Sequence, residues 1–91
     1  TVQPGQFTLA QNYPNPFNPS TTIEYSLDRS GIVTLKIYNI LGQEVGTLVN
    51  GFQNVGSYLA VFNASGFSSG IYFYRLQSEK LSQTQKMILM K

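Results

Sequence analysis

The 91-residue sequence predicts an all-β fold, an immunoglobulin-like antiparallel β-sandwich of about seven strands, with a small barrel as the alternative. Three observations support this prediction. Apolar and polar residues alternate with a period of two along several segments, as they do on half-buried strands. Turn residues separate these segments at intervals of roughly 8–12 residues. Helical periodicity is nearly absent, and neither an internal repeat nor a second domain is evident.

The predicted strands follow one another along the whole chain. A short strand around residues 7–10 precedes a proline-rich segment. Alternation is clearest where Ile23, Tyr25 and Leu27, and then Val33, Leu35 and Ile37, recur at every second position. The intervening Arg29-Ser30-Gly31 predicts that these two strands form a hairpin. Further strands are expected at 45–49, 57–63, 71–76 and 84–90, with a Ser- and Gly-rich loop at 63–70. Asn50-Gly51 is the strongest turn signal in the chain.

Three of these strands are apolar on both faces. They are residues 57–63, residues 71–76 and the segment 87–90. One face of a sandwich sheet normally meets water, so the second apolar face needs an explanation. Either loops cover it and single exposed apolar residues carry no meaning, or it is a contact surface for another protein or module.

Composition excludes several classes of function. The chain has no Cys, His or Trp, which excludes disulfides, thiol nucleophiles, imidazole ligands and Ser-His-Asp triads. Only 11% of residues are charged and the net charge is +2, without the basic stripe of a nucleic-acid binder. No apolar run is long enough to span a membrane as a helix. The four carboxylates (Glu24, Asp28, Glu44 and Glu79) form neither a calcium-binding cluster nor a catalytic pair, so we expect no enzyme, no metal and no cofactor.

The proline-rich segment is the most distinctive part of the chain. Three prolines within six residues restrict their own φ angles and those of the preceding residues, which predicts a rigid, irregular loop. Tyr13 and Phe17 are expected to anchor this loop as a cap over one end of the sandwich; a polyproline ligand for a partner is the alternative. The structural loop residues are Pro14, Asn15, Pro16, Phe17, Asn18 and Pro19. The chain begins at Thr1 without a signal peptide, so we expect a fragment or processed module, with residues 1–6 as a linker remnant and 7–91 as a single domain.

Four motifs, in order, resemble the C-terminal sorting domains (type A) of the type IX, or Por, secretion system. The first is the segment 7–23, which contains Asn12-Tyr13-Pro14-Asn15-Pro16-Phe17-Asn18-Pro19-Ser20-Thr21-Thr22. The others are Ile37-Tyr38-Asn39-Ile40-Leu41-Gly42-Gln43-Glu44-Val45, Ser69-Gly70-Ile71-Tyr72-Phe73-Tyr74-Arg75-Leu76, and Thr84-Gln85-Lys86-Met87-Ile88-Leu89-Met90-Lys91. The resemblance covers residues 7–91. One departure is Phe62-Asn63, where many members carry Trp-Asp.

The resemblance implies a function in protein targeting. Such domains are immunoglobulin-like sandwiches that follow a cargo protein, are recognised in the periplasm by outer-membrane secretion machinery, and direct the cargo to the cell surface or the medium. The motif positions place candidate recognition residues at Gly70, Tyr72, Tyr74, Arg75, Lys86, Met87, Ile88, Leu89, Met90 and Lys91. Each also has a structural explanation: core packing for the tyrosines, a turn with positive φ for Gly70, and a solvated charge for Arg75 and Lys86.

The charge distribution singles out the C-terminal strand. Residues 1–23 carry no charged side chain, whereas residues 80–91 carry three lysines and no acid. Lysines beside an apolar strand protect a sheet edge from unwanted pairing. They also suit a partner in the export machinery that adds the strand to its own sheet.

Two other functions remain open from the sequence. The two-sided apolar strands and the weakly charged surface favour a self-assembling extracellular surface or filament subunit. The twelve aromatic residues would allow a carbohydrate-binding accessory module, although Trp is absent and the tyrosines alternate as core residues do.

Overall fold

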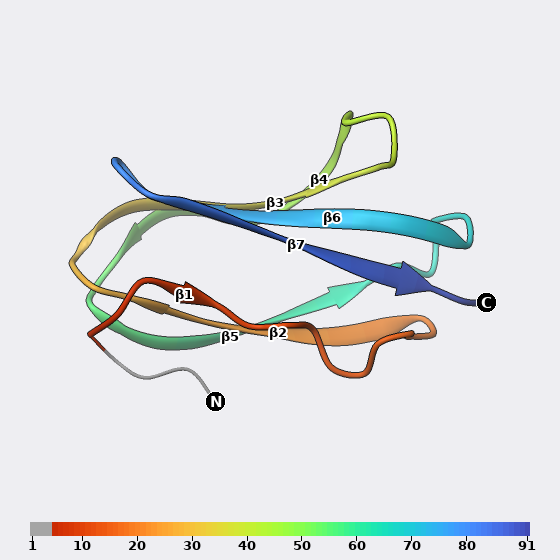
Figure 1. Ribbon diagram of the computed structural model, residues 1–91, viewed down its shortest axis with the longest axis horizontal. Helices are drawn as coiled ribbons and strands as arrows, with labels where there is room; N and C mark the ends of the chain where they lie inside the picture. Colours follow the sequence, from red (N-terminus) through yellow and green to blue (C-terminus); the bar gives the residue numbers. More distant parts are fainter. Residues whose placement is uncertain (1–4) are drawn as a thin grey trace.

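The computed structural model describes residues 5–91 and confirms an all-β sandwich (Figure 1). Two antiparallel sheets pack face to face, and the molecule measures 36 × 25 × 16 Å along its principal axes. The first four residues of the expected linker lie outside the described part. The seven strands are β1 (Thr8–Leu9), β2 (Ser20–Leu27), β3 (Gly31–Tyr38), β4 (Glu44–Gln53), β5 (Gly56–Asn63), β6 (Gly70–Gln77) and β7 (Ser82–Leu89).

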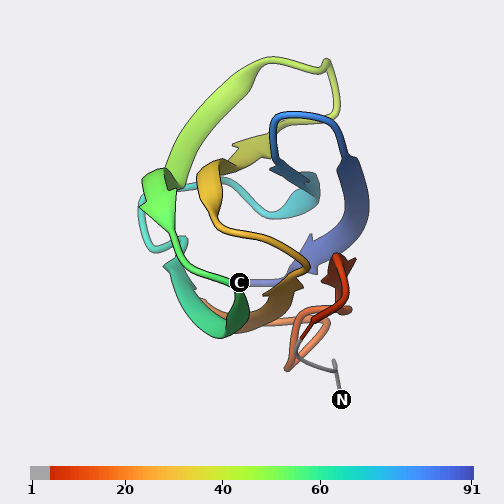
Figure 2. The same cartoon turned by 90° about the vertical axis from the view of Figure 1, so that its left-hand side faces the viewer.

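The strand order is that of an immunoglobulin-like sandwich with its fourth strand in the second sheet. One sheet has the order β1-β2-β5 and the other the order β4-β3-β6-β7. In the constant-type immunoglobulin arrangement the first, second and fifth strands share a sheet with the fourth. Here β4 pairs with β3 instead. The two layers are visible end-on in Figure 2.

The core lies between the two sheets and is made by the inward half of each alternating strand. Successive side chains of a strand point to opposite faces, so the period-two pattern of the sequence becomes one buried and one outward face. Burial of each large apolar side chain contributes about 1.5–3 kcal/mol. The buried apolar residues are Leu9, Phe17, Ile23, Tyr25, Leu27, Val33, Leu35, Ile37, Phe62, Ala64, Tyr72, Tyr74, Leu76, Met87 and Leu89.

The hairpin predicted around Arg29-Ser30-Gly31 is wrong. The chain does reverse there, but it also crosses from one sheet to the other, so β2 and β3 are not hydrogen-bonded to each other. Strand β2 pairs with β1 and β5, and strand β3 pairs with β4 and β6. The turn residues therefore indicated a reversal correctly, while the pairing was decided by partners distant in the sequence.

The turn predicted at Asn50-Gly51 is also wrong. These residues lie within β4, opposite Thr34 and Val33 of β3. The strand continues to Gln53, whose Oε1 accepts a hydrogen bond of 2.7 Å from the Tyr25 hydroxyl in the other sheet. The chain turns only after that contact, at residues 54–55.

Two residues, Tyr13 and Phe17, were expected to anchor the proline-rich loop to the domain. Only the Phe17 side chain does so. Phe17 is buried, whereas the Tyr13 side chain is 80% exposed. Only the backbone of Tyr13 is fixed, by two hydrogen bonds to Thr22. The peptide bonds that precede Pro14, Pro16 and Pro19 are cis.

Candidate functional site

The two C-terminal motifs lie side by side in the second sheet. Strands β6 and β7 pair along their whole length, which places Ile71 opposite Ile88, Phe73 opposite Lys86, and Arg75 opposite Thr84. These residues lie on the outward face, because they alternate with Tyr72, Tyr74 and Leu76 of β6 and with Met87 and Leu89 of β7, which are buried. We call the surface made by Ile71, Phe73, Arg75, Thr84, Lys86 and Ile88, with Tyr38 and Lys36 of β3 beside them, the motif face.

Four of the ten candidate recognition residues lie inside the core. Tyr74 and Met87 are 0% exposed, and Tyr72 and Leu89 are nearly as deeply buried. The Tyr72 hydroxyl donates to the Ser68 carbonyl at 2.7 Å, and the Tyr74 hydroxyl donates to the Ala10 carbonyl at 2.7 Å. Burial raises the pKa of Tyr74 to about 12, because the phenolate would be poorly solvated there. A partner of the folded domain cannot contact these side chains.

Arg75 lies flat on the motif face. Its guanidinium carbon is 5.0 Å from the centroid of the Tyr38 ring, a cation–π geometry. Its Nε also lies 3.4 Å from the Thr84 hydroxyl. These contacts with β3 and β7 hold the arginine in one place, while the side chain stays exposed.

The motif face has a positive electrostatic character. Lys36 and Arg75 are opposite each other on β3 and β6, and Lys86 lies on the next strand. The acid beside them is Glu44, whose carboxylate already pairs with the Lys36 ammonium at 3.2 Å. Arg75 and Lys86 have no acidic partner among residues 5–91.

The end of the chain is fixed close to the motif face. The Lys91 backbone N–H donates to the Ser69 hydroxyl at 3.0 Å, and the Lys91 ammonium donates to the Ser65 carbonyl at 2.7 Å. Gly70 begins β6 with a φ of 153°, a conformation that residues with a side chain rarely adopt. Met90, by contrast, is 58% exposed. The exposed recognition candidates are therefore Gly70, Arg75, Lys86, Met90 and Lys91, with Ile88 half-buried.

Strand β7 is an edge strand, but the N-terminal segment covers its second half. Phe17 forms a short parallel bridge with Leu89: its N–H donates to the Ile88 carbonyl and its carbonyl accepts from the Met90 N–H, both at 3.0 Å. The Ile88 N–H donates to the Asn15 side-chain oxygen at 2.9 Å. These backbone groups are already paired, so strand addition at this part of β7 would first require displacement of the proline-rich loop.

Several residues of the motif face were absent from the sequence-based candidates. They are Ile71 and Phe73 of β6, Thr84 of β7, and Lys36 and Tyr38 of β3. The signal that could have found Phe73 and Thr84 is the period of two, because outward positions alternate with the buried Tyr72, Tyr74 and Met87. Lys36 and Tyr38 required the pairing of β3 with β6, which no local pattern predicts.

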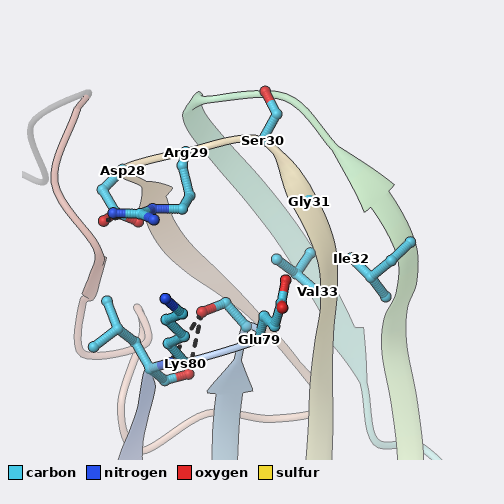
Figure 3. Close-up of a pocket in the computed structure, with 10 residues that line it drawn as sticks. Asp28, Arg29, Ser30, Gly31, Ile32, Val33, Glu79 and Lys80 are labelled. Atoms are coloured by element: carbon cyan, nitrogen blue, oxygen red, sulfur yellow. Dashed lines mark hydrogen bonds and ion pairs between the residues drawn. The ribbon is translucent and has the colours of Figure 1, made fainter.

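A pocket of about 160 Å³ lies at the opposite end of the sandwich, between the β2–β3 and β6–β7 connections (Figure 3). It brings together two acids and two bases, and Asp28 pairs with Arg29 at 3.6 Å. Among residues 5–91 no acidic cluster fit to hold a metal occurs, and no helix is long and apolar enough to cross a membrane. The pocket is lined by Asp28, Arg29, Ser30, Gly31, Ile32, Val33, Ser78, Glu79, Lys80 and Leu81.

A comparison with protein-family models identifies the family. The model of the secretion system C-terminal sorting domain, a signal of type IX secretion, matches residues 11–90, nearly the whole chain. The chain belongs to this family of sorting domains. Searches of curated proteins and of solved structures gave no significant match. The family is one of secretion signals and is not known for catalysis, and it implies an N-terminal cargo, secretion machinery as partner, and export to the cell surface or the extracellular space.

The sorting domain accommodates its departure at Phe62-Asn63 without loss of packing. The Phe62 ring is buried and packs against Phe17 and Phe67, with centroid distances of 6.1 and 5.4 Å. The Asn63 side-chain oxygen accepts a hydrogen bond of 3.0 Å from the Ser65 N–H. The amide oxygen therefore does here what a carboxylate oxygen would do in the same turn.

The most exposed aromatic side chains do not form a stacking platform. Tyr13 is 80% exposed in the proline-rich loop, and Phe52 is 64% exposed at the end of β4. They belong to segments of different sheets. This arrangement argues against the carbohydrate-binding alternative, which needs aromatic rings aligned on one surface.

Proposed function

We propose that this sorting domain is a non-catalytic secretion signal whose motif face is recognised by the type IX machinery. The observation that carries the proposal is the convergence of two separate motifs. The outward halves of the third and fourth motifs form one surface, and their inward halves form the core. The motifs thus have two tasks, folding and recognition, at alternating positions.

The charges of the motif face define the partner's chemistry. Arg75 and Lys86 lie beside the apolar side chains of Phe73 and Ile88. A complementary partner presents carboxylates around an apolar centre. Such complementarity mainly raises the rate and specificity of association. Its salt dependence follows from screening over about 8–10 Å at physiological ionic strength.

The route of the cargo follows from this function. The domain passes into the periplasm behind its N-terminal cargo, is bound by outer-membrane machinery, and directs the cargo to the surface or the medium. In Figure 1 the described chain begins at the end of the sandwich opposite to the end at which the C-terminus lies. The described chain therefore enters the domain far from the last residues of β7.

Deletion of the C-terminal strand is a poor test of recognition. Removal of residues 85–91 takes Met87 and Leu89 out of the core, where both are almost fully buried. Loss of each side chain alone costs about 2–5 kcal/mol, a large share of the 5–15 kcal/mol that stabilises a domain. Such a deletion unfolds the domain, and lost secretion would then have two explanations.

Single charge reversals on the motif face separate the two explanations. We expect Lys86→Glu and Arg75→Glu each to lower secretion of a cargo fusion about tenfold or more, since one like-charge contact costs at least about 1.4 kcal/mol. Lys80→Glu, in the β6–β7 turn, is the matched control and should secrete normally. Thermal melts of the purified variants test folding. Normal secretion of both motif-face variants would contradict the proposal.

A further inference from the structure

The two long sides of the sandwich are built differently. On the β1–β7 side, side-chain amides join the sheets: Gln83 accepts from the Leu9 N–H at 3.0 Å and donates to the Phe7 carbonyl at 3.0 Å, and Gln85 donates to the Leu9 carbonyl at 3.0 Å. On the other side lie β4 and β5, which belong to different sheets. Each has a single hydrogen-bonded neighbour strand.

Strand β5 lacks the features that normally protect a sheet edge. Natural edges carry charges, prolines or bulges. Residues 45–74, which include β5 and most of β4, contain no charged side chain and no proline. Strand β4 has two irregularities in its register with β3. Strand β5 pairs with β2 without interruption from Ser20↔Asn63 to Leu27↔Gly56, so it is a regular, uncharged edge of eight residues.

Backbone hydrogen bonds identify which groups of β5 face outward. Thr22 and Glu24 direct their backbone groups away from β5, because they bond to Tyr13 and Ala10. Ile23 therefore points its groups toward β5, where its register partner is Ala60. Since the direction alternates along a strand, the N–H and C=O groups of Ser57, Leu59, Val61 and Asn63 face the free edge. Among residues 5–91 no hydrogen bond to these groups is formed beyond the β2–β5 pairing.

The side chains at this edge are apolar and exposed. Leu59 is 71% exposed and Val61 is 66% exposed, and both lie on the outward face of their sheet. Exposed apolar β-strand edges are sites of strand pairing with another chain. A strand that pairs with this uncharged edge should itself carry no charged side chain, because that charge would have no partner on β5.

We propose that the β5 edge pairs with the β5 edge of a second copy of this chain, in antiparallel orientation about a two-fold axis. The arrangement places Leu59 opposite Val61 of the second copy, and Ser57 opposite Asn63. All the outward N–H and C=O groups of both strands are then paired, and four apolar side chains, Leu59 and Val61 from each copy, form one cluster. The two three-stranded sheets become one continuous sheet.

Charge does not oppose this self-association. The charged residue nearest to the edge on this sheet is Glu24, which is opposite Leu59 on β2. In the paired arrangement the Glu24 residues of the two copies are about three strand spacings, or about 14 Å, apart. This exceeds the screening length of about 8–10 Å in physiological salt. An isologous interface of this kind is the commonest form of homodimer.

The expected association is weak. A strand-edge contact buries much less surface than the roughly 1,200–2,000 Å² of a stable complex, so we expect a dissociation constant on the order of 100 μM. Sedimentation equilibrium of the 91-residue chain, from tenfold below to tenfold above that constant, should show a monomer–dimer equilibrium. Monomer throughout this range would overturn the proposal.

A charge placed on the edge distinguishes β5 from other surfaces. Val61→Lys should weaken association at least about tenfold, or about 1.4 kcal/mol. Ile40→Lys, which adds the same charge at a residue 68% exposed in the β3–β4 turn, should not. Unchanged association of Val61→Lys, or equal weakening by Ile40→Lys, contradicts the β5 edge. A chemically synthesised chain with a methyl group on the Leu59 backbone nitrogen lacks one hydrogen-bond donor of the edge and has the same charge. This chain should also associate more weakly than the parent.

Cysteine cross-linking tests the register. The chain has no cysteine, so each single variant carries one thiol and every disulfide formed joins two copies of the chain. Residues opposite each other lie about 5.5 Å apart between Cα atoms, within the range for a disulfide, whereas diagonal neighbours are about 7–8 Å apart. A mixture of Leu59→Cys and Val61→Cys should therefore oxidise to the mixed dimer faster than either variant alone forms its own. Equal rates would contradict the proposed pairing.

Discussion

At the scale of single residues, side-chain amides fix the turns of this weakly charged domain. Asn39 shows how. Its side-chain oxygen accepts hydrogen bonds from the backbone N–H groups of Leu41 and Gln43, at 2.9 and 3.0 Å. Gly42 completes the turn with a φ of 81°, which favours glycine. This turn joins β3 to β4 and explains the Asn and Gly of the second motif in physical terms.

Removal of the Asn39 amide should destabilise the domain. We expect Asn39→Ala to lower the free energy of unfolding by about 1–2 kcal/mol, because two backbone donors lose their acceptor in a partly solvated turn. Asn39→Asp retains an accepting oxygen and should stay within about 0.5 kcal/mol of the parent. Urea denaturation measures both. If the alanine and aspartate variants were equally stable, the accepting oxygen would not be what fixes this turn.

At the scale of elements, the proline-rich loop and β7 stabilise each other. Phe17 inserts its ring into the core and bridges to Leu89, while Asn15 accepts from the Ile88 N–H. On the same edge the Gln11 amide donates to the Lys86 carbonyl at 2.7 Å. The last strand is therefore held on one side by β6 and on the other by residues more than seventy positions earlier.

Loss of the Asn15 amide should loosen the end of β7 locally. We expect Asn15→Ala to increase the exchange rate of the Ile88 amide hydrogen about tenfold, equivalent to about 1.4 kcal/mol of local stability. Asn50→Ala on β4 is the control and should leave that amide unchanged, because β3 and β6 lie between β4 and β7 in the sheet. Hydrogen exchange followed by NMR measures both. An Ile88 amide that exchanges as slowly as in the parent would show that the Asn15 contact adds no local stability to this end of β7.

The same elements show which parts of the fold the sequence could predict. Alternation predicted β2 and β3, because the inward face of a strand is a local property, and apolar runs between turn residues predicted the strands that are apolar on both faces. Pairing partners are not local: Arg29-Ser30-Gly31 suits a turn within a sheet as well as one between sheets. The hydrogen bonds by which Gln83 and Gln85 join the two sheets could not be predicted either, since polar residues on a strand normally indicate a solvent-exposed face. For the site, Arg75 and Lys86 were predicted, whereas Lys36 and Tyr38 required the β3–β6 register.

At the scale of the whole molecule, two buried tyrosines connect the sheets. Tyr25 of β2 donates to Gln53 of β4, and Tyr74 of β6 donates to the Ala10 carbonyl after β1. Each phenol thus satisfies its hydroxyl in the opposite sheet while its ring fills the core. Burial raises the pKa of Tyr25, and it raises that of Tyr74 to about 12. Both phenols donate these hydrogen bonds between the sheets only while they are protonated.

This requirement predicts loss of stability in alkali. An unfolded tyrosine ionises near pH 10, so between about pH 10 and 12 the folded state binds more protons than the unfolded state, and the free energy of unfolding falls as pH rises. The stabilisation is fully present below pH 10 and is lost through the folded-state pKa of Tyr74, about 12. Urea denaturation from pH 8 to 12 should show this decline.

Tyr74→Phe should have a shallower slope of the free energy of unfolding against pH, although it is less stable at pH 8 by about 0.5–1.5 kcal/mol because it lacks the hydrogen bond. Tyr13→Phe, at an exposed phenol, should keep the parent slope. A Tyr74→Phe slope equal to that of the parent would show that the loss of stability in alkali does not depend on the Tyr74 phenol.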